Sequence, residues 1–86
     1  MIFFMKLKEM KVREQARIIG YEKEEGEYFR RLLSLGLTPG QIITVCRISP
    51  FGGPLQVDVG GCSLAIRSYE ADLLKLSPLQ SGREDK

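Results

Sequence analysis

The sequence predicts a mainly β domain: a small SH3-like five-stranded antiparallel barrel with one α-helix inserted between the first and second strands. Three observations predict this fold class. A helical stripe of apolar residues ends at a glycine, a proline-glycine turn follows it, and short runs of strand-forming residues separated by turn-forming residues fill the rest of the chain. Because a meander of short strands leaves open sheet edges, closure into a barrel is favoured.

The first half of the domain is predicted as strand, helix and tight turn. Strand formers predominate in 15–21, and the apolar residues of 27–35 follow a helical stripe. Gly36 stands where a helix C-terminus favours a left-handed residue. Pro39 and Gly40 occupy the second and third positions of a type II turn. These last three residues are therefore expected to serve backbone geometry.

The second half is predicted as strands and one helical turn. Ile, Val and Thr fill 41–49, as expected for a well-buried strand. Gly60 and Gly61 form a hairpin signal between two alternating runs. Ser68 is expected to cap a single helical turn. The strands that remain are expected at 55–59, 62–67 and 73–76.

The length allows one small domain. A chain of 86 residues buries roughly 60–65% of its unfolded surface, which leaves no room for an enzyme cleft beside a separate cofactor domain. We expect the domain to span 6–77, with an apolar N-terminal extension at 1–5 and a polar, disordered tail at 78–86. Translation starts at either Met1 or Met5.

The sequence shows neither a membrane span nor an export signal. No stretch approaches the roughly 20 apolar residues that cross a bilayer. The apolar start at 1–5 is too short for the core of a signal peptide, and no cleavage-like site follows it. We therefore expect a cytoplasmic protein.

The side-chain chemistry predicts no enzyme, no catalytic residue and no cofactor. The chain has no histidine, so the usual general base and the commonest metal ligand are both missing. The two cysteines form no CxxC motif, and the glycine pairs lack a phosphate-loop context. The acidic residues Glu22, Glu24, Glu25 and Glu27 could hold a divalent cation weakly, although such carboxylates are more often solvated.

Five apolar residues are expected to be mainly buried. Leu32, Leu33 and Leu35 are expected mainly in the core, as part of the helical stripe. Cys46 and Cys62 lie in apolar runs and are expected to pack as small buried hydrophobes.

Four sequence blocks occur in one order along the chain. They are Leu7–Met10 with Ala16–Gly20, then Arg30–Gly40 (R-x-L-x-x-L-G-L-x-P-G), then Val45–Pro54 (V-x-x-x-x-P-x-G-x-P), then Ser63–Ala71 (S-L-x-I-R-x-x-E-A). With this spacing the chain resembles the FeoA family, small cytosolic accessory proteins of bacterial ferrous iron uptake. The resemblance covers about residues 7 to 76.

The resemblance implies an SH3-like barrel with an inserted helix and a role beside FeoB, a membrane iron transporter with a cytosolic GTPase domain. The family has no settled catalytic or iron-binding residues, so none is carried over. The same module occurs at the C-terminus of iron-dependent repressors, where it is fused to DNA-binding and dimerisation domains. A stand-alone chain favours the transport role.

Five residues are candidates for partner binding: Arg30, Arg31, Leu37, Phe51 and Arg67. Arginine is enriched at binding hot spots, although exposed arginines also serve to solubilise a surface. Leu37 and Phe51 each either pack under the barrel or face a partner. If both are exposed, they form a small apolar anchor patch.

Two other function classes compete with a FeoB-type partner. The basic stretch around Lys6, Lys8 and Lys11 suggests a small nucleic-acid-binding barrel, but the net charge of only +2 argues against nucleic acid. The acidic run suggests a ferrous iron sensor or chaperone. The sequence assigns no oligomeric state.

Overall fold

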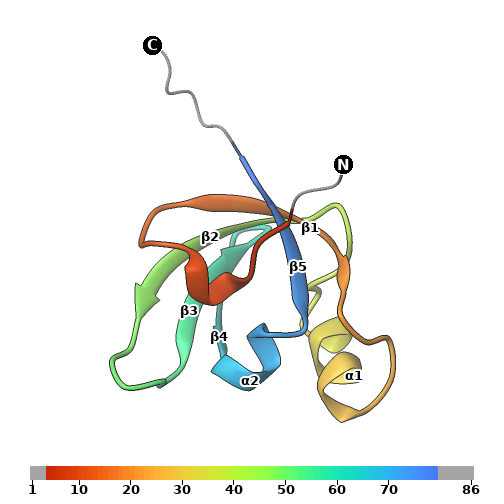
Figure 1. Cartoon of the computed structure of the whole chain (residues 1–86). Coiled ribbons are helices and arrows are strands. Elements are labelled where there is room, and N and C mark those ends of the chain that lie inside the picture. The colour runs from red at the N-terminus through yellow and green to blue at the C-terminus, as the bar shows by residue number, and fades with distance from the viewer. Residues whose placement is uncertain (1–3, 80–86) are drawn as a thin grey trace.

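The computed structural model describes residues 4–79 of the chain, and within them five strands form one antiparallel sheet (Figure 1). The strand order is β4-β3-β2-β1-β5. The strands are β1 (Gln15–Tyr21), β2 (Ile42–Ile48), β3 (Leu55–Val59), β4 (Cys62–Ile66) and β5 (Leu74–Pro78). The helices are η1 (a 3-10 helix, Leu7–Glu9), α1 (Glu27–Ser34) and α2 (Ser68–Ala71). The predicted five antiparallel strands, with a helix between the first and second, are confirmed.

Two β-bulges bend the sheet. The register between β1 and β5 shifts between Ile18 and Gly20, and the register between β2 and β3 shifts between Val45 and Arg47. An extra residue on one strand kinks it and increases its right-handed twist. The sheet therefore curves around the core instead of lying flat (Figure 1).

The hydrophobic core lies on the concave side of the curved sheet. Period-two alternation supplies it: the three odd-numbered residues of β3 are buried and the two between them are exposed. Burying a Leu or Ile side chain stabilises the fold by about 1.5–3 kcal/mol each. The largest fully buried hydrophobic residues are Leu7, Ile18, Leu32, Leu37, Ile43, Ile66, Leu74, Leu76, Val45 and Val57.

The end of α1 is a Schellman motif, and this motif places Leu37 in the core. Gly36 adopts a φ of 87°, and its N–H donates to the carbonyl of Leu33 at 3.0 Å. The N–H of Leu37 donates to the carbonyl of Leu32, also at 3.0 Å. This motif packs the residue after the left-handed glycine against the last turn of the helix. Both leucines are fully buried. The assignment of Leu37 to the partner-binding surface is therefore corrected.

A tight turn then leads from α1 into β2. Gly40 has a φ of 98°, and the N–H of Gln41 donates to the carbonyl of Thr38 at 3.1 Å, as a type II turn requires. The turn is bonded to β1 through the carbonyl and the N–H of Ile18. Gly40 donates to the carbonyl of Ile18, and Ile18 donates to the carbonyl of Gln41, each at 2.8 Å. The Pro39-Gly40 turn thus fixes where β2 begins.

Three of the core expectations are wrong. The strand expected to be well buried over 41–49 is buried only at Ile43 and Val45. Leu33 is 40% exposed, because Leu32 occupies the core-facing position of α1 and the next residue lies about 100° around the helix. Both cysteines are exposed. Cys46 lies at the bulge of β2, where the alternation breaks, and Cys62 begins β4 directly after the hairpin turn.

The cap of α2 also differs from the expectation. Arg67 is the N-cap, and Ser68 is the first helical residue. The hydroxyl of Ser68 donates instead to the carbonyl of Gly52 at 3.2 Å. The Ser68 side chain therefore connects α2 to the loop between β2 and β3.

The ends of the described chain belong to the sheet. Met5 pairs with Leu76, and β5 continues through Pro78. Met5 and Pro78, which flank the domain expected at 6–77, thus take part in strand pairing. The rest of the expected extension and tail, 1–3 and 80–86, lies outside the described residues. None of the helices formed by residues 4–79 has the length and apolar character needed to cross a bilayer.

Candidate partner-binding groove

A groove between α1 and α2 brings together three of the five candidate partner-binding residues. It has a volume of about 420 Å³. Its lining residues are Glu27, Tyr28, Arg30, Arg31, Ser34, Arg67 and Glu70. We call this surface the arginine groove. Arg30 and Arg31 come from α1 and Arg67 from the N-cap of α2, so the groove exists only once the two helices are in place.

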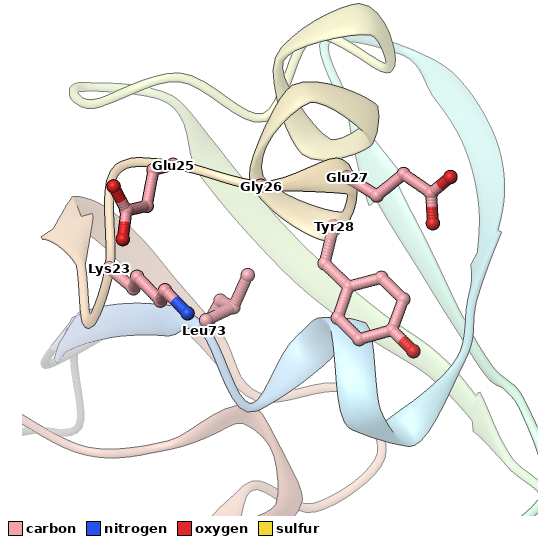
Figure 2. Close-up of a pocket in the computed structure, with 6 residues that line it drawn as sticks. All are labelled: Lys23, Glu25, Gly26, Glu27, Tyr28 and Leu73. Atoms are coloured by element: carbon pink, nitrogen blue, oxygen red, sulfur yellow. The ribbon is translucent and has the colours of Figure 1, made fainter.

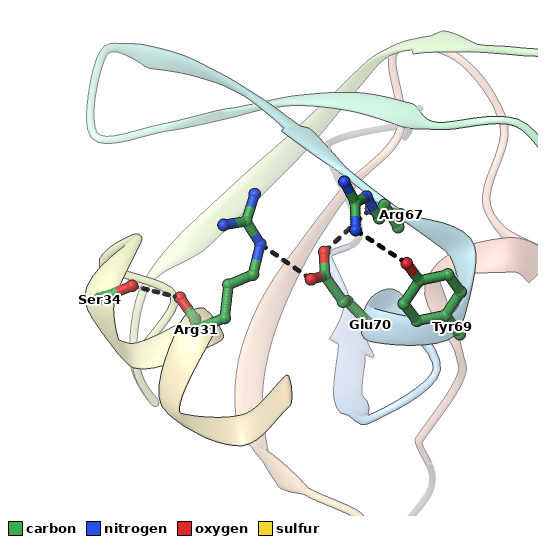
Figure 3. A network of polar contacts seen from close by, with 5 residues as sticks. All are labelled: Arg31, Ser34, Arg67, Tyr69 and Glu70. Carbon is green, nitrogen blue, oxygen red and sulfur yellow. Dashed lines mark hydrogen bonds and ion pairs between the residues drawn. The ribbon is translucent and has the colours of Figure 1, made fainter. Parts of the chain in front are cut away.

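Glu70 is the buried centre of this region. Its side chain is 2% exposed and its Oε2 lies 2.8 Å from Nε of Arg31, whose own side chain is 49% exposed. Its Oε1 accepts the backbone N–H of Arg67 at 3.2 Å. A buried carboxylate needs such partners, because an unpaired charge in the interior is strongly destabilising. The Arg31–Glu70 pair thus joins α1 to α2 (Figure 3).

Two tyrosines form an aromatic wall beside the arginines. Nη1 of Arg67 donates to the hydroxyl of Tyr69 at 2.9 Å. This hydrogen bond raises the pKa of Arg67 above its ordinary value. The rings of Tyr69 and Tyr28 lie 4.9 Å apart, and each residue is 46% exposed. Tyrosine and arginine are the residue types that dominate binding hot spots.

The fourth candidate, Phe51, lies outside the groove but close to α2. It is fully exposed in the loop between β2 and β3 and has a φ of 59°, which is unusual for a bulky residue. The neighbouring Gly52 accepts the Ser68 hydroxyl, so the loop contacts the first residue of α2. A Cβ at Gly53 would lie 2.8 Å from Cβ of Ser49, so the loop has no room for a larger residue there.

Sequence reasoning missed Tyr28, Tyr69 and Glu70 as site residues. Tyr28 falls within 27–35, where the apolar residues are expected to form the stripe of the helix. Glu70 carries a partial signal, since it stands three residues after the N-cap, where a glutamate caps the backbone. Its pairing with Arg31 spans 39 positions and has no local signal.

The acidic run is not arranged as a metal site. Within residues 4–79, no group of three or more His, Cys, Asp or Glu side chains is placed to hold a metal ion. Figure 2 shows the carboxylates of Glu25 and Glu27 pointing away from each other on the two sides of Gly26. These residues border a second pocket of about 350 Å³, with Leu73 and Tyr28 at its apolar side.

The basic N-terminal stretch is tied to this acidic run. Nζ of Lys6 lies 2.9 Å from the carboxylate of Glu22 and donates to the carbonyl of Asp72 at 2.7 Å. The hydrogen bond from Lys6 lowers the pKa of Glu22. Glu9 and Glu14 lie among the remaining lysines, and their carboxylates accept hydrogen bonds from backbone N–H groups of the same stretch. The stretch is thus a mixed surface and not a purely basic one.

Comparisons with known proteins identify the family. The model of the FeoA domain matches residues 5–78. The FeoA protein from Chlorobium tepidum is 35% identical; the match covers 93% of this chain and 74% of that chain, with a TM-score of 0.78. An iron uptake regulatory protein, FeoA, is 28% identical over 90% of this chain and 100% of that chain, with a TM-score of 0.80.

A third match is the zinc complex of FeoA from Stenotrophomonas maltophilia, described as a prokaryotic SH3 domain protein. It is 28% identical, the match covers 85% of this chain and 89% of that chain, and the TM-score is 0.72. The fold described above is thus the SH3-like fold of these proteins. Together, the family match over residues 5–78 and these structures show that the chain belongs to the FeoA domain family, which is non-catalytic and associated with ferrous iron transport.

Proposed function

We propose that this protein is a cytoplasmic accessory factor of bacterial ferrous iron uptake that binds the cytosolic part of a FeoB-type GTPase transporter. Membership of the FeoA family supports the process. The observation that carries the proposed mode of action is the arginine groove, in which Arg30, Arg31 and Arg67 meet at one exposed surface. The chain acts by protein contact and not by chemistry of its own.

The groove is suited to binding because much of it is already ordered. Arg31 is held by Glu70 and Arg67 by Tyr69. Immobilising a flexible side chain at an interface costs about 0.5–1.5 kcal/mol. Since these two arginines are fixed before any partner arrives, less of that entropy remains to be lost on binding. Arg30 forms no ion pair or side-chain hydrogen bond within residues 4–79 and is left for a partner.

Calorimetric titration with the purified cytosolic part of the FeoB-type transporter tests this proposal, with and without guanine nucleotide. We expect the Arg30→Gln/Arg67→Gln variant to bind at least about tenfold more weakly, a loss of about 1.4 kcal/mol. Arg47→Gln is the matched control, because Arg47 is exposed on β2 and does not line the groove. Equal affinity for the folded double variant would contradict the assignment of the groove.

Ferrous iron uptake by cells carrying the same variants tests the biological role. We expect the double variant to take up iron more slowly than cells carrying the wild-type chain, while the Arg47→Gln control behaves as wild type. If the transporter fragment shows no binding to the wild-type chain in any nucleotide state, the proposed partner is wrong.

A further inference from the structure

We propose that the arginine groove recognises a partner segment through a side-chain carboxylate on that segment. This inference rests on the proposed function, since it names the chemistry of the partner at the same surface. It is carried by the charge balance, the donor geometry and the aromatic wall of the groove.

The charge balance of the groove matches a single negative charge. Three guanidinium groups and two carboxylates, those of Glu27 and Glu70, line it, which leaves a net charge of +1. The buried carboxylate of Glu70 is already paired with Arg31. A dianionic phosphate would be repelled by both carboxylates, and its two negative charges would exceed the net charge of +1. A carboxylate carries one charge and is matched by one free guanidinium.

The donor geometry leaves hydrogen-bond donors for such a carboxylate. A guanidinium has five N–H donors. Arg31 uses Nε for Glu70, and in Figure 3 its two terminal nitrogens point away from that carboxylate. Arg67 uses Nη1 for Tyr69. The terminal nitrogens that remain can bind a carboxylate in the bidentate manner that arginine favours.

The aromatic wall indicates a peptide segment as the source of the carboxylate. Tyr28 lines the groove, its ring contacts the ring of Tyr69, and the Tyr69 hydroxyl is bonded to Arg67; each tyrosine is 46% exposed. A small free acid such as acetate would leave these rings in water and fill little of a groove of about 420 Å³. An acidic residue flanked by apolar residues would bury the rings while its carboxylate reaches the guanidinium groups.

Titration of the isotope-labelled chain with two blocked peptides, followed by backbone amide shifts, tests the proposal. One probe is Gly-Leu-Glu-Leu-Gly, and the other replaces its glutamate with glutamine. We expect the glutamate peptide to shift the amides of 28–34 and 67–70 with a dissociation constant on the order of 1 mM. The glutamine peptide should bind at least about tenfold more weakly, and Arg67→Gln but not Arg47→Gln should abolish the difference.

Three outcomes would contradict the proposal that the groove recognises a carboxylate. They are equal responses to the two peptides, no response to either, or a stronger response of the same amides to inorganic phosphate than to the glutamate peptide. Shifts of these amides that depend on protein concentration alone would identify a second copy of the chain as the occupant.

The two proposals fail separately. Suppose that the transporter fragment binds through the groove but the glutamate and glutamine peptides bind equally well. Then the proposed recognition of a carboxylate is wrong and the proposed partner stands. If the glutamate peptide binds and the transporter fragment does not, only the proposed partner is wrong.

Discussion

Arg30 and Arg31 are neighbours on α1, yet their guanidinium groups have different surroundings. Arg31 compensates the buried carboxylate of Glu70, and Arg30 faces solvent. At the scale of single residues, Arg31 therefore contributes to stability through its Nε as well as lining the groove, and Arg30 is free to contribute to recognition alone. The sequence RR alone does not distinguish these roles.

Replacing Arg31 with alanine should destabilise the fold by about 1–3 kcal/mol, because Glu70 then keeps only the backbone N–H of Arg67 as a partner. Arg30→Ala should change the free energy of unfolding by less than about 0.5 kcal/mol, as for other exposed substitutions. Urea unfolding of the two variants measures both values. Equal losses would show that the Arg31–Glu70 pair does not contribute net stability.

Leu33, expected in the core, is partly exposed, and Leu37, a candidate for partner binding, is buried. Leu37→Ala should cost about 2–5 kcal/mol by opening a cavity in the core, while Leu33→Ala, at a position already 40% exposed, should cost less than about 1 kcal/mol. Thermal unfolding of the two variants is a direct comparison of leucines only four positions apart. A larger loss for Leu33→Ala would contradict the packing described here.

At the scale of elements, the end of α1 depends on the left-handed conformation of Gly36. Gly36→Ala should destabilise the fold by about 1–2 kcal/mol, because an L-residue is strained at a φ of 87°. Gly20→Ala is the matched control: that position has no positive φ and open space around it. Chemical denaturation of both variants gives the comparison. Tolerance of Gly36→Ala would mean that the helix can end in another way.

The elements were predictable because their signals are local. Period-two alternation located β3 and β4, and glycines located the turns. The burial of Leu37 was not predictable from alternation, because it follows from the Schellman motif, which folds the chain back on Leu32. The exposure of Cys46 was missed for a similar reason: a bulge shifts the register of β2, and no residue type marks it.

The arginine groove was predictable only in part. Arg30, Arg31 and Arg67 could be selected as residue types common at hot spots, but their meeting depends on how α1 packs against α2. Glu70, the residue that fixes this packing, is a charged side chain in the interior. Composition gives no reason to expect it there.

At the scale of the whole molecule, Lys6 joins the N-terminal segment to two distant parts of the chain. It pairs with Glu22 after β1 and donates to the carbonyl of Asp72 after α2. These contacts hold the segment before β1 against the two loops that flank the first and last strands.

This contact predicts a pH dependence. The pKa of Glu22 is lowered in the folded chain, so its contribution to stability is full above the unfolded value of about 4.3 and is lost as the pH falls through the folded value. Glu22→Gln should therefore destabilise the fold at about pH 7 and be neutral at about pH 2. Glu25→Gln, in the same exposed loop, is the control.

Urea midpoints of Glu22→Gln, Glu25→Gln and the wild-type chain at both pH values measure this effect. A constant difference between wild type and Glu22→Gln across the pH range would show that the Lys6–Glu22 pair is not responsible.

The two exposed cysteines affect how self-association of the chain is measured. Cys46 and Cys62 lie on different strands, β2 and β4, and both thiols reach solvent. In a buffer that contains an oxidised disulfide reagent, two successive exchange steps can join exposed thiols of two molecules, while the reagent is reduced to its thiols. A dimer observed without reductant is therefore not evidence of non-covalent self-association. Only a dimer that persists in reductant is such evidence. The same thiols are convenient attachment points for probes, since neither contributes to the core.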